Sequence, residues 1–191
     1  MKFLLAIAMI LLIPFRIYSE ACCPSVDLEI RGAEFFSSNH KFRKIYGNCP
    51  TVQLEASFPV FCSIKSFANI TFFSKEGHST PLKDHTHLKM VPVTFGLKYY
   101  VDLPCNFFGY IGGGASYTWV HIHNHSSFVK SKINDHRFGG VAKIGLGYRY
   151  NCFFATIFAD YFFQKVRIHP HKKHQTDISG TFVGASLGIQ F

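Results

Sequence analysis

Three absences narrow the class of this protein. Beyond the first 15 residues, no stretch approaches the roughly 18 continuous apolar residues that a membrane-spanning helix needs. Long helical periodicity is also missing, as are internal repeats, low-complexity tracts and a second domain. The chain after its amino-terminal segment is therefore either a soluble β-rich domain or a barrel that crosses a membrane with strands.

Acidic residues are also scarce. The chain has 11 Asp and Glu residues against 20 Lys and Arg residues, which gives a formal net charge of +9 with neutral histidine. Such an excess attracts anionic partners. Nucleic acid is not expected among them, because the sequence has no nucleic-acid-binding motif and its amino terminus directs it to export.

The amino terminus reads as a secretory signal. Lys2 precedes an apolar run of 13 residues, Phe3 to Phe15, and Ser19-Glu20-Ala21 offers small residues before Cys22. The pattern predicts a cleaved signal peptide over residues 1–21 and one mature domain over 22–191. A lipoprotein signal that acylates Cys22 is the alternative, although no Leu stands three residues before the cysteine.

The carboxy-terminal stretch carries the clearest strand pattern. Apolar residues at Val183, Ala185, Leu187, Ile189 and Phe191 alternate with small or polar ones, and the chain stops at the final Phe. This period of two predicts a strand with one apolar face. The stretch resembles the terminal strand of small bacterial outer-membrane β-barrels of the OmpA and OmpX type. The resemblance implies an outer-membrane location, contact with lipid and lipopolysaccharide, and recognition of Phe191 by the barrel-assembly machinery.

Eight alternating segments agree with this resemblance. Short connections between them alternate with long ones near 38–49, 75–87, 122–135 and 167–175. Short turns at one end and long loops at the other predict an all-β, closed, antiparallel, eight-stranded transmembrane barrel, whose lumen is only wide enough for side chains. A soluble sandwich would not need the 31 Phe and Tyr residues of the chain. The segments are 26–37, 50–60, 62–74, 88–102, 106–121, 136–150, 152–166 and 176–191.

Eight charged residues of these segments fall on the face opposite the apolar one. Because a charge on the lipid face near the midplane costs roughly 2–4 kcal/mol, they are expected to face the lumen. An ion-pair network that plugs the barrel is favoured over a narrow polar path. Five bases against three acids leave a positive surplus inside. The inward residues are Glu29, Arg31, Glu55, Lys65, Lys98, Lys143, Arg149 and Asp160.

The 11 histidines all fall in the long loops or at their edges. Alternate histidines on a hairpin edge can share a Zn²⁺, Cu²⁺ or Ni²⁺ ion, so weak binding of a divalent transition metal is predicted without any other cofactor. Ordinary polar loop residues are the simpler interpretation. The candidate ligands are His121, His123, His125, His169, His171 and His174.

Basic residues follow the same loops. Of the 18 Lys and Arg residues after residue 21, 13 lie in the loops or at their edges, with only four acids. This surface is expected to attract lipopolysaccharide phosphates, host glycans or another anionic host surface. The four acids are Glu76, Asp84, Asp135 and Asp177.

The cysteines suggest crosslinking. Cys62, Cys105 and Cys152 each lie at a short turn, on the same side as the tail with Cys22 and Cys23, whereas Cys49 stands alone in the first long loop. The periplasm is oxidising, and turns spread around a barrel are too far apart to pair easily. Disulfides to other envelope proteins are therefore predicted, which resembles the linked envelopes of some intracellular bacteria.

An enzyme is not expected. His125-Ser126-Ser127 resembles the His-x-Ser pair of barrel deacylases, but it lies in a long loop with Asp135 as the only nearby acid. The sequence therefore favours a barrel that serves envelope structure or surface interaction through its basic, His-rich loops. Capture or transport of a transition metal or small solute is the alternative, and a lipid-modifying enzyme comes third.

Overall fold

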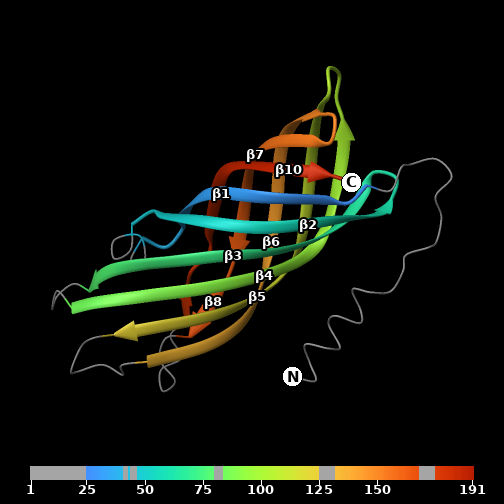
Figure 1. Ribbon diagram of the computed structural model, residues 1–191. Coiled ribbons are helices and arrows are strands. Elements are labelled where there is room, and N and C mark those ends of the chain that lie inside the picture. Colours follow the sequence, from blue (N-terminus) through green and yellow to red (C-terminus); the bar gives the residue numbers. More distant parts are fainter. Residues whose placement is uncertain (1–24, 41–42, 44–46, 80–83, 125–131, 168–174) are drawn as a thin grey trace.

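A single closed antiparallel barrel contains most of the chain (Figure 1). The computed structural model describes residues 25–40, 43, 47–79, 84–124, 132–167 and 175–191. Within these residues, eight strands follow one another around the barrel in the order β1-β10-β7-β6-β5-β4-β3-β2. The strands are β1 (Asp27–Ser37), β2 (Cys49–Phe61), β3 (Ile64–Ser79), β4 (Asp84–Asp102), β5 (Phe107–Asn124), β6 (Lys132–Tyr150), β7 (Phe153–Phe163) and β10 (Gly180–Gln190).

Closure joins the first and last strands, as predicted. β1 and β10 pair from Asp27 with Gln190 to Ser37 with Gly180. Two further backbone bonds, of 3.1 and 3.0 Å, link Val26 and Phe191 beyond the ends of these strands. The final aromatic residue therefore takes part in closing the barrel. We call this end, which also holds the three short turns, the turn end, and the opposite end the loop end.

Four strands are taller than the sequence pattern predicted. β3, β4, β5 and β6 have 16 to 19 residues, whereas β1, β2, β7 and β10 have 11 to 13. Parts of the expected loops 75–87 and 122–135 are therefore strand. These stretches are mostly polar in sequence, so hydrophobic alternation gives little signal there although backbone pairing continues.

The β7–β10 connection contains less barrel strand than the sequence pattern predicted. Strand was expected to 166 and again from 176, but β7 ends at Phe163 and β10 begins at Gly180. A separate two-stranded sheet stands between them, formed by β8 (Lys165–Arg167) and β9 (Gln175–Asp177). Its chain leaves the barrel wall at Gln164, whose backbone carbonyl accepts a hydrogen bond of 2.9 Å from the Ile178 amide.

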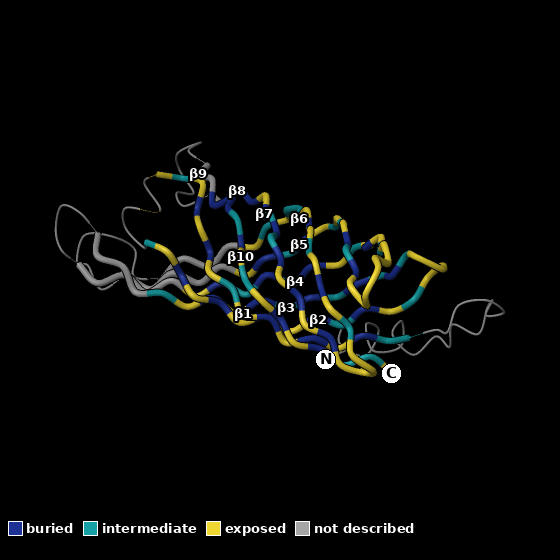
Figure 2. The backbone as a smooth tube through the Cα atoms, turned by 90° about the horizontal axis from the view of Figure 1, so that it is seen from above, coloured by how far each residue is buried: buried dark blue, intermediate teal, exposed yellow. Residues whose placement is uncertain are grey.

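Burial alternates along every barrel strand (Figure 2). In β2, for example, Val52, Leu54 and Phe58 are exposed, whereas Gln53 and Glu55 are buried. The exposed outer wall is thus mostly apolar and the buried polar residues face inward, the reverse of a water-soluble barrel. The predicted inward facing of the charged residues and the predicted apolar outer face of 183–191 are confirmed.

The glycine run in β5 is explained by register. Gly112 lies between Lys98 of β4 and Lys143 of β6 in the cross-strand pairing. A Cβ atom at Gly112 would lie 2.7 Å from the Leu97 carbonyl oxygen and 3.0 Å from Cγ of Lys98. Glycine therefore leaves room on the inner wall for the two lysines to enter the lumen.

The amino-terminal predictions lie outside the described residues. The signal peptide over 1–21, acylation at Cys22 and the boundary of the 22–191 domain remain predictions. In the part of the chain that the structure describes, no helix has the length and apolar character needed to cross a membrane.

Candidate functional site

The middle of the lumen holds a network of six charged side chains. Three bases and three acids come from five different strands, and every one is buried. The predicted inward facing of these residues is confirmed. They are Glu29 and Arg31 of β1, Glu55 of β2, Lys98 of β4, Lys143 of β6 and Asp160 of β7.

Arg31 connects the two sides of the lumen. Its Nη1 donates to Glu55 Oε2 at 3.0 Å and to Asp160 Oδ2 at 2.8 Å. Its Nη2 donates to the Tyr110 hydroxyl at 3.3 Å, and its guanidinium lies 3.6 Å from the centre of the Phe158 ring. A planar guanidinium suits this position because it binds carboxylates and stacks on an aromatic ring at once.

Glu55 gathers the bases around it. Lys98 Nζ donates to Oε1 of Glu55, and Lys143 Nζ donates to Oε2 at 2.7 Å. Lys143 also reaches Asp160 Oδ2 at 2.9 Å, so the network runs from β2 across to β7. Removal of Glu55 would leave three buried bases with fewer acids, the situation in which a broken buried pair costs about 3–5 kcal/mol.

Register brings like charges together, which the sequence alone did not reveal. Glu29 and Glu55 are direct cross-strand partners in β1 and β2. Direct opposition of like charges is destabilising. Arg31 compensates, with Nε 3.2 Å from Glu29 Oε1, and Lys98 Nζ lies 3.6 Å from the same oxygen. The network is therefore interdependent, and no base serves one acid only.

The positive surplus predicted for the lumen, five bases against three acids, is reduced in the structure to five bases against four acids. The sequence reading omitted Asp27, which is buried and accepts from Lys65 Nζ at 2.8 and 2.7 Å. Arg149, at the turn end, has Nη1 3.7 Å from the exposed Asp102 carboxylate. With the six central charges balanced three to three, every inward base has an acid nearby.

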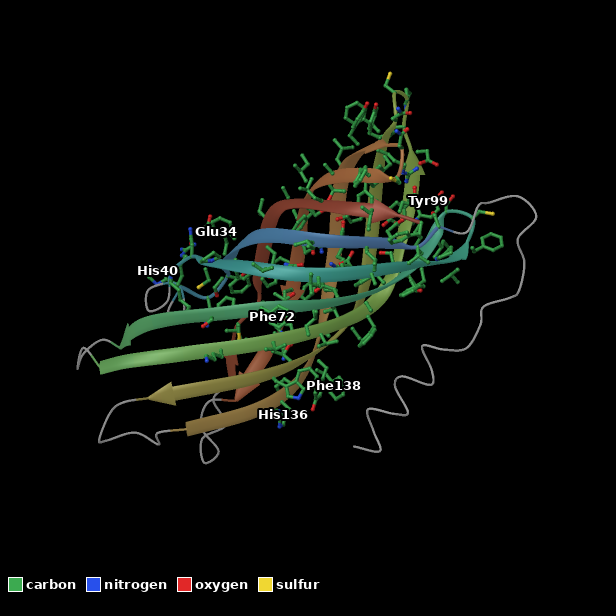
Figure 3. All side chains as sticks on the ribbon, in the orientation of Figure 1. Glu34, His40, Phe72, Tyr99, His136 and Phe138 are labelled. Atoms are coloured by element: carbon green, nitrogen blue, oxygen red, sulfur yellow. The ribbon has the colours of Figure 1, made fainter. Side chains whose placement is uncertain are left out.

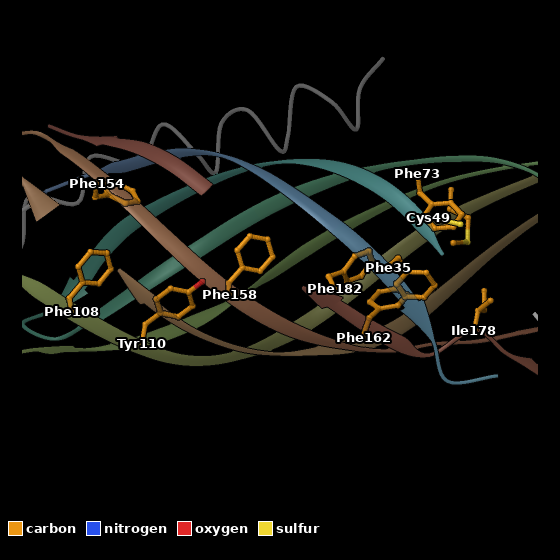
Figure 4. Close-up of a cluster of buried hydrophobic side chains, with 11 residues drawn as sticks. Phe35, Cys49, Phe73, Phe108, Tyr110, Phe154, Phe158, Phe162, Ile178 and Phe182 are labelled. Atoms are coloured by element: carbon orange, nitrogen blue, oxygen red, sulfur yellow. The ribbon is translucent and has the colours of Figure 1, made fainter. Parts of the chain in front are cut away.

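An apolar cluster lies inside the loop end of the barrel (Figure 4). Phe35 packs on Phe73 and Phe182 with ring centres 5.5 and 4.7 Å apart, and Phe162 lies 6.0 Å from Phe182. Ile178, just before β10, is buried in the same cluster. The β9–β10 connection thus enters the mouth of the barrel and adds to its core.

Cys49 belongs to this cluster, contrary to the sequence reading. It was expected in the first long loop, but it is the first residue of β2 and is fully buried. β2 begins one residue earlier than the alternating pattern suggested, which places Cys49 opposite Phe35 in the register.

A third layer of side chains fills the turn end. Tyr100 packs against Phe108 and Tyr110, with ring centres 6.0 and 5.6 Å apart, and Phe108 contacts Phe154. Along its length the lumen therefore passes from an apolar layer through a charged layer to an aromatic one.

Two aromatic belts ring the outer wall. Near the loop end, Tyr117 contacts Trp119 and Phe138 with ring centres 4.8 and 4.9 Å apart. Phe138 and His136 project from β6 beside one another (Figure 3). Near the turn end, Phe107 packs on Tyr148 at 5.2 Å. Exposed aliphatic residues lie between these belts, the pattern of a lipid-facing barrel wall.

The structure describes the backbone of only two of the six predicted metal ligands. His125, His169, His171 and His174 lie outside the described residues. His121 and His123 are placed by their backbone in β5, where they pair with Lys89 and His87 of β4. Among the side chains that the structure describes, no group of three or more His, Cys, Asp or Glu residues is arranged to hold a metal ion.

The turn cysteines are exposed, as the crosslinking hypothesis requires. Cys62, Cys105 and Cys152 lie at the three short turns, and the four described cysteines form no disulfide with one another. Cys105 and Asn106 occupy left-handed conformations at φ 61° and 64°, which suits the centre of a tight hairpin turn. Cys22 and Cys23 lie outside the described residues.

Comparison with known proteins supports the fold. No protein-family description matches the chain, and no curated protein matches it in sequence. Among solved structures, Neisserial surface protein A superposes with a TM-score of 0.62 at 12% identity, covering 88% of this chain and 97% of that chain. The Escherichia coli outer membrane protein W gives 0.58 at 13% identity, with 90% and 100% covered.

The fold is that of the small outer-membrane barrels. A third neighbour is Ail, the attachment invasion locus protein of Yersinia pestis, with a TM-score of 0.54, 14% identity and coverage of 88% and 97%. That structure is a complex with the heparin analogue sucrose octasulfate. An apolar outer wall around a charged interior, in this fold, indicates a bacterial outer-membrane location for the present chain.

Proposed function

We propose that the protein is an integral outer-membrane barrel with a closed lumen, which serves envelope structure and presents a basic outer surface to polyanions. The observation that carries the proposal is the six-charge network, because it links opposite walls of the lumen by direct ion pairs. The apolar and aromatic layers above and below it add two further barriers. The proposed role is non-enzymatic.

The closed lumen has a direct functional consequence. Liposomes that contain the refolded protein should remain impermeable to small sugars, since a solute would have to displace ion pairs buried in a low-dielectric interior. Rapid swelling of such liposomes in an isotonic sugar solution would instead favour the alternative, transport of a small solute.

The basic loop end supports the second half of the proposal. Arg43 and Lys89 are exposed there. The other loop bases fall in sequence within the long connections β1–β2, β3–β4, β5–β6 and β7–β10 or at their edges. The fold neighbour Ail is described in complex with a sulfated sugar. Polyanion binding of this kind is electrostatic, so it should weaken as salt shortens the Debye length.

Binding of sucrose octasulfate tests this surface. The wild-type barrel in detergent should bind it at low salt, and a variant with Arg43, Lys44, Lys172 and Lys173 changed to Ala should bind more weakly and with less dependence on salt. Asp102→Asn at the turn end is the matched control and should bind like the wild type. Equal affinity in all three proteins would exclude these loops as the binding surface.

Phe191 and three exposed cysteines lie at the turn end, where they could contact other envelope proteins. Phe191 closes the barrel, so we propose that the assembly machinery reads it before closure. We also propose disulfides from Cys62, Cys105 or Cys152 to other envelope proteins. Non-reducing gels of intact envelopes should show linked species that reductant removes, and these should disappear in a variant with all three cysteines changed to Ser. Monomer alone under both conditions would refute the crosslinks.

A further inference from the structure

An apolar groove lies on the outer wall where β6, β7, β10 and β1 run side by side. It has a volume of about 720 Å³, and small exposed side chains form its floor, among them Ala155 of β7 and Ala185 of β10. At the turn end it is bounded by Phe107 and Tyr148, a packed pair of the aromatic belt. Because aromatic belts mark the interfaces of a membrane barrel, the groove opens to hydrocarbon and ends at the level of the lipid headgroups.

A second apolar groove, of about 830 Å³, lies beside the first. The two share only Ile30 of β1 and Leu187 of β10, which are direct cross-strand partners and are 63% and 73% exposed. These two side chains form a ridge. Beyond the ridge, Ala56 and Ala68 oppose each other in β2 and β3 and line the second groove. Two adjacent grooves with one ridge between them match a lipid that has two acyl chains.

A polar pocket of about 540 Å³ meets the first groove at the turn end. Phe107 lines both, and β6 passes from the groove at Tyr148 into the pocket at Arg149. An apolar hollow thus continues into a polar one, the order in which a lipid presents its tail and its headgroup. The pocket is also lined by Asp102, Leu103, Cys105, Asn106 and Asn151.

Arg149 supplies the positive charge of this pocket. Its guanidinium carbon lies 4.9 Å from the centre of the Phe108 ring, and its Nη1 lies 3.7 Å from the Asp102 carboxylate, beyond hydrogen-bond distance. Among the described residues, its buried Nε has no hydrogen-bond partner. Lys65, the other described base at the turn end, is instead paired with Asp27 at 2.7 Å. Arg149 is therefore the base at this end that is available to an anion.

We propose that the two grooves and the pocket together bind one phospholipid of the leaflet at the turn end, with an ethanolamine headgroup. The guanidinium of Arg149 suits phosphate oxygens, which it can bind through two parallel N–H groups. The Asp102 carboxylate accepts hydrogen bonds and suits the primary ammonium of the same headgroup. One base and one acid match one phosphate and one ammonium, while the acyl chains lie on either side of the ridge formed by Ile30 and Leu187.

Native mass spectrometry of the refolded barrel tests the site. The detergent micelle contains equal amounts of phosphatidylethanolamine, phosphatidylcholine and phosphatidylglycerol. We expect one retained lipid per wild-type barrel, with the ethanolamine lipid at least about fivefold more abundant than either of the others, because only it donates ammonium hydrogen bonds to a carboxylate. Phosphatidylcholine carries the same charges without those hydrogens, and phosphatidylglycerol has no ammonium.

Four variants separate the contributions of headgroup and tail. Arg149→Gln should lower retention of all three lipids by at least about fivefold, because it removes the charged phosphate contact. Asp102→Asn should keep a bound lipid but lose the preference for ethanolamine. Ala155→Phe should lower retention of every lipid, since the ring fills the first groove. Ala115→Phe is its matched control, because Ala115 is exposed on β5 and lines neither groove, and it should behave like the wild type.

Heat-modifiable mobility on gels establishes that each variant is a folded barrel before it is measured. No retained lipid on the wild type, unchanged retention in Arg149→Gln, or an equal loss in Ala155→Phe and Ala115→Phe would each overturn the proposal. Equal retention of the three lipids by the wild type would overturn the ethanolamine assignment. None of these results bears on the closed lumen or on the basic loops, which are tested by permeability and by polyanion binding.

Discussion

The inner and outer walls of this barrel are made by the same strands but obey opposite rules. On the outer wall, Ile111, Ile144 and Ile157 are exposed by 61%, 57% and 64%. On the inner wall, neighbouring residues of the same strands include Lys143 and Asp160, exposed by 3% and 1%. Lipid takes the place of a protein core on one side, and ion pairs take the place of water on the other.

The two walls differ in how strongly a substitution should change the stability of the barrel. An outer-wall residue contacts lipid, which rearranges around a changed apolar side chain. An inner-wall residue contacts fixed charges from other strands, which do not rearrange without leaving a charge unpaired. Substitutions on the inner wall should therefore lower the free energy of unfolding wherever they unbalance the charges of the network. Substitutions on the outer wall should lower it strongly only where they place a charge against lipid.

The largest effect is expected at Glu55. Glu55→Ala leaves Arg31, Lys98 and Lys143 with only two central acids, so the free energy of unfolding should fall by about 3–5 kcal/mol. Denaturant titration of the refolded barrel in lipid vesicles measures this change. Asp102→Asn, whose side chain is 84% exposed, is the control and should change stability by no more than about 1 kcal/mol.

A double variant tests whether the charges of the network depend on one another. Glu55→Leu combined with Lys98→Met leaves two central bases with two central acids. Its stability should recover a large part of the loss seen with Glu55→Leu alone, because an apolar pair often replaces a buried ion pair without cost. Simple additivity of the two single losses would show that the charges act independently and that the network is not a unit.

On the outer wall, the effect should depend on depth. Ile144→Lys places a charge midway between the aromatic belts and should cost about 2–4 kcal/mol of unfolding free energy. Phe138→Lys lies at the loop-end belt and is 81% exposed, so it should cost only about 0–1 kcal/mol. Equal costs at the two positions would contradict the placement of the bilayer between the belts.

Glycines give the smallest contrast. A Cβ at Gly96 would lie 2.6 Å from Cα of Gly114, so Gly96→Ala should cost about 1–3 kcal/mol through backbone displacement. A Cβ at Gly32 meets nothing within 4 Å, so Gly32→Ala should be neutral or stabilise by up to about 1 kcal/mol. The same unfolding assay distinguishes them, and a similar loss at both positions would refute the close approach of β4 and β5.

Alternation in the sequence was sufficient to predict the barrel and its facing. Val183 to Phe191 and the inward charges obey a strict period of two, which lipid on one side and a filled lumen on the other impose. The height of β3 to β6 escaped prediction, because beyond the membrane neither face needs to be apolar. Their pairing there is visible only in three dimensions.

Connectivity inside the lumen also could not be predicted from the sequence. Arg31 and Asp160 are 129 residues apart in the chain, and their contact depends on the stagger of every strand between them. Asp27 was missed because it stands at the very start of the first alternating segment.

The claim that the network closes the lumen is tested most directly by single-channel recording in planar lipid bilayers. The wild-type barrel, inserted at neutral pH, should give no stable ion conductance, because ion pairs, an apolar layer and an aromatic layer lie across the path. Steady, reproducible conductance steps from the wild-type protein would contradict it.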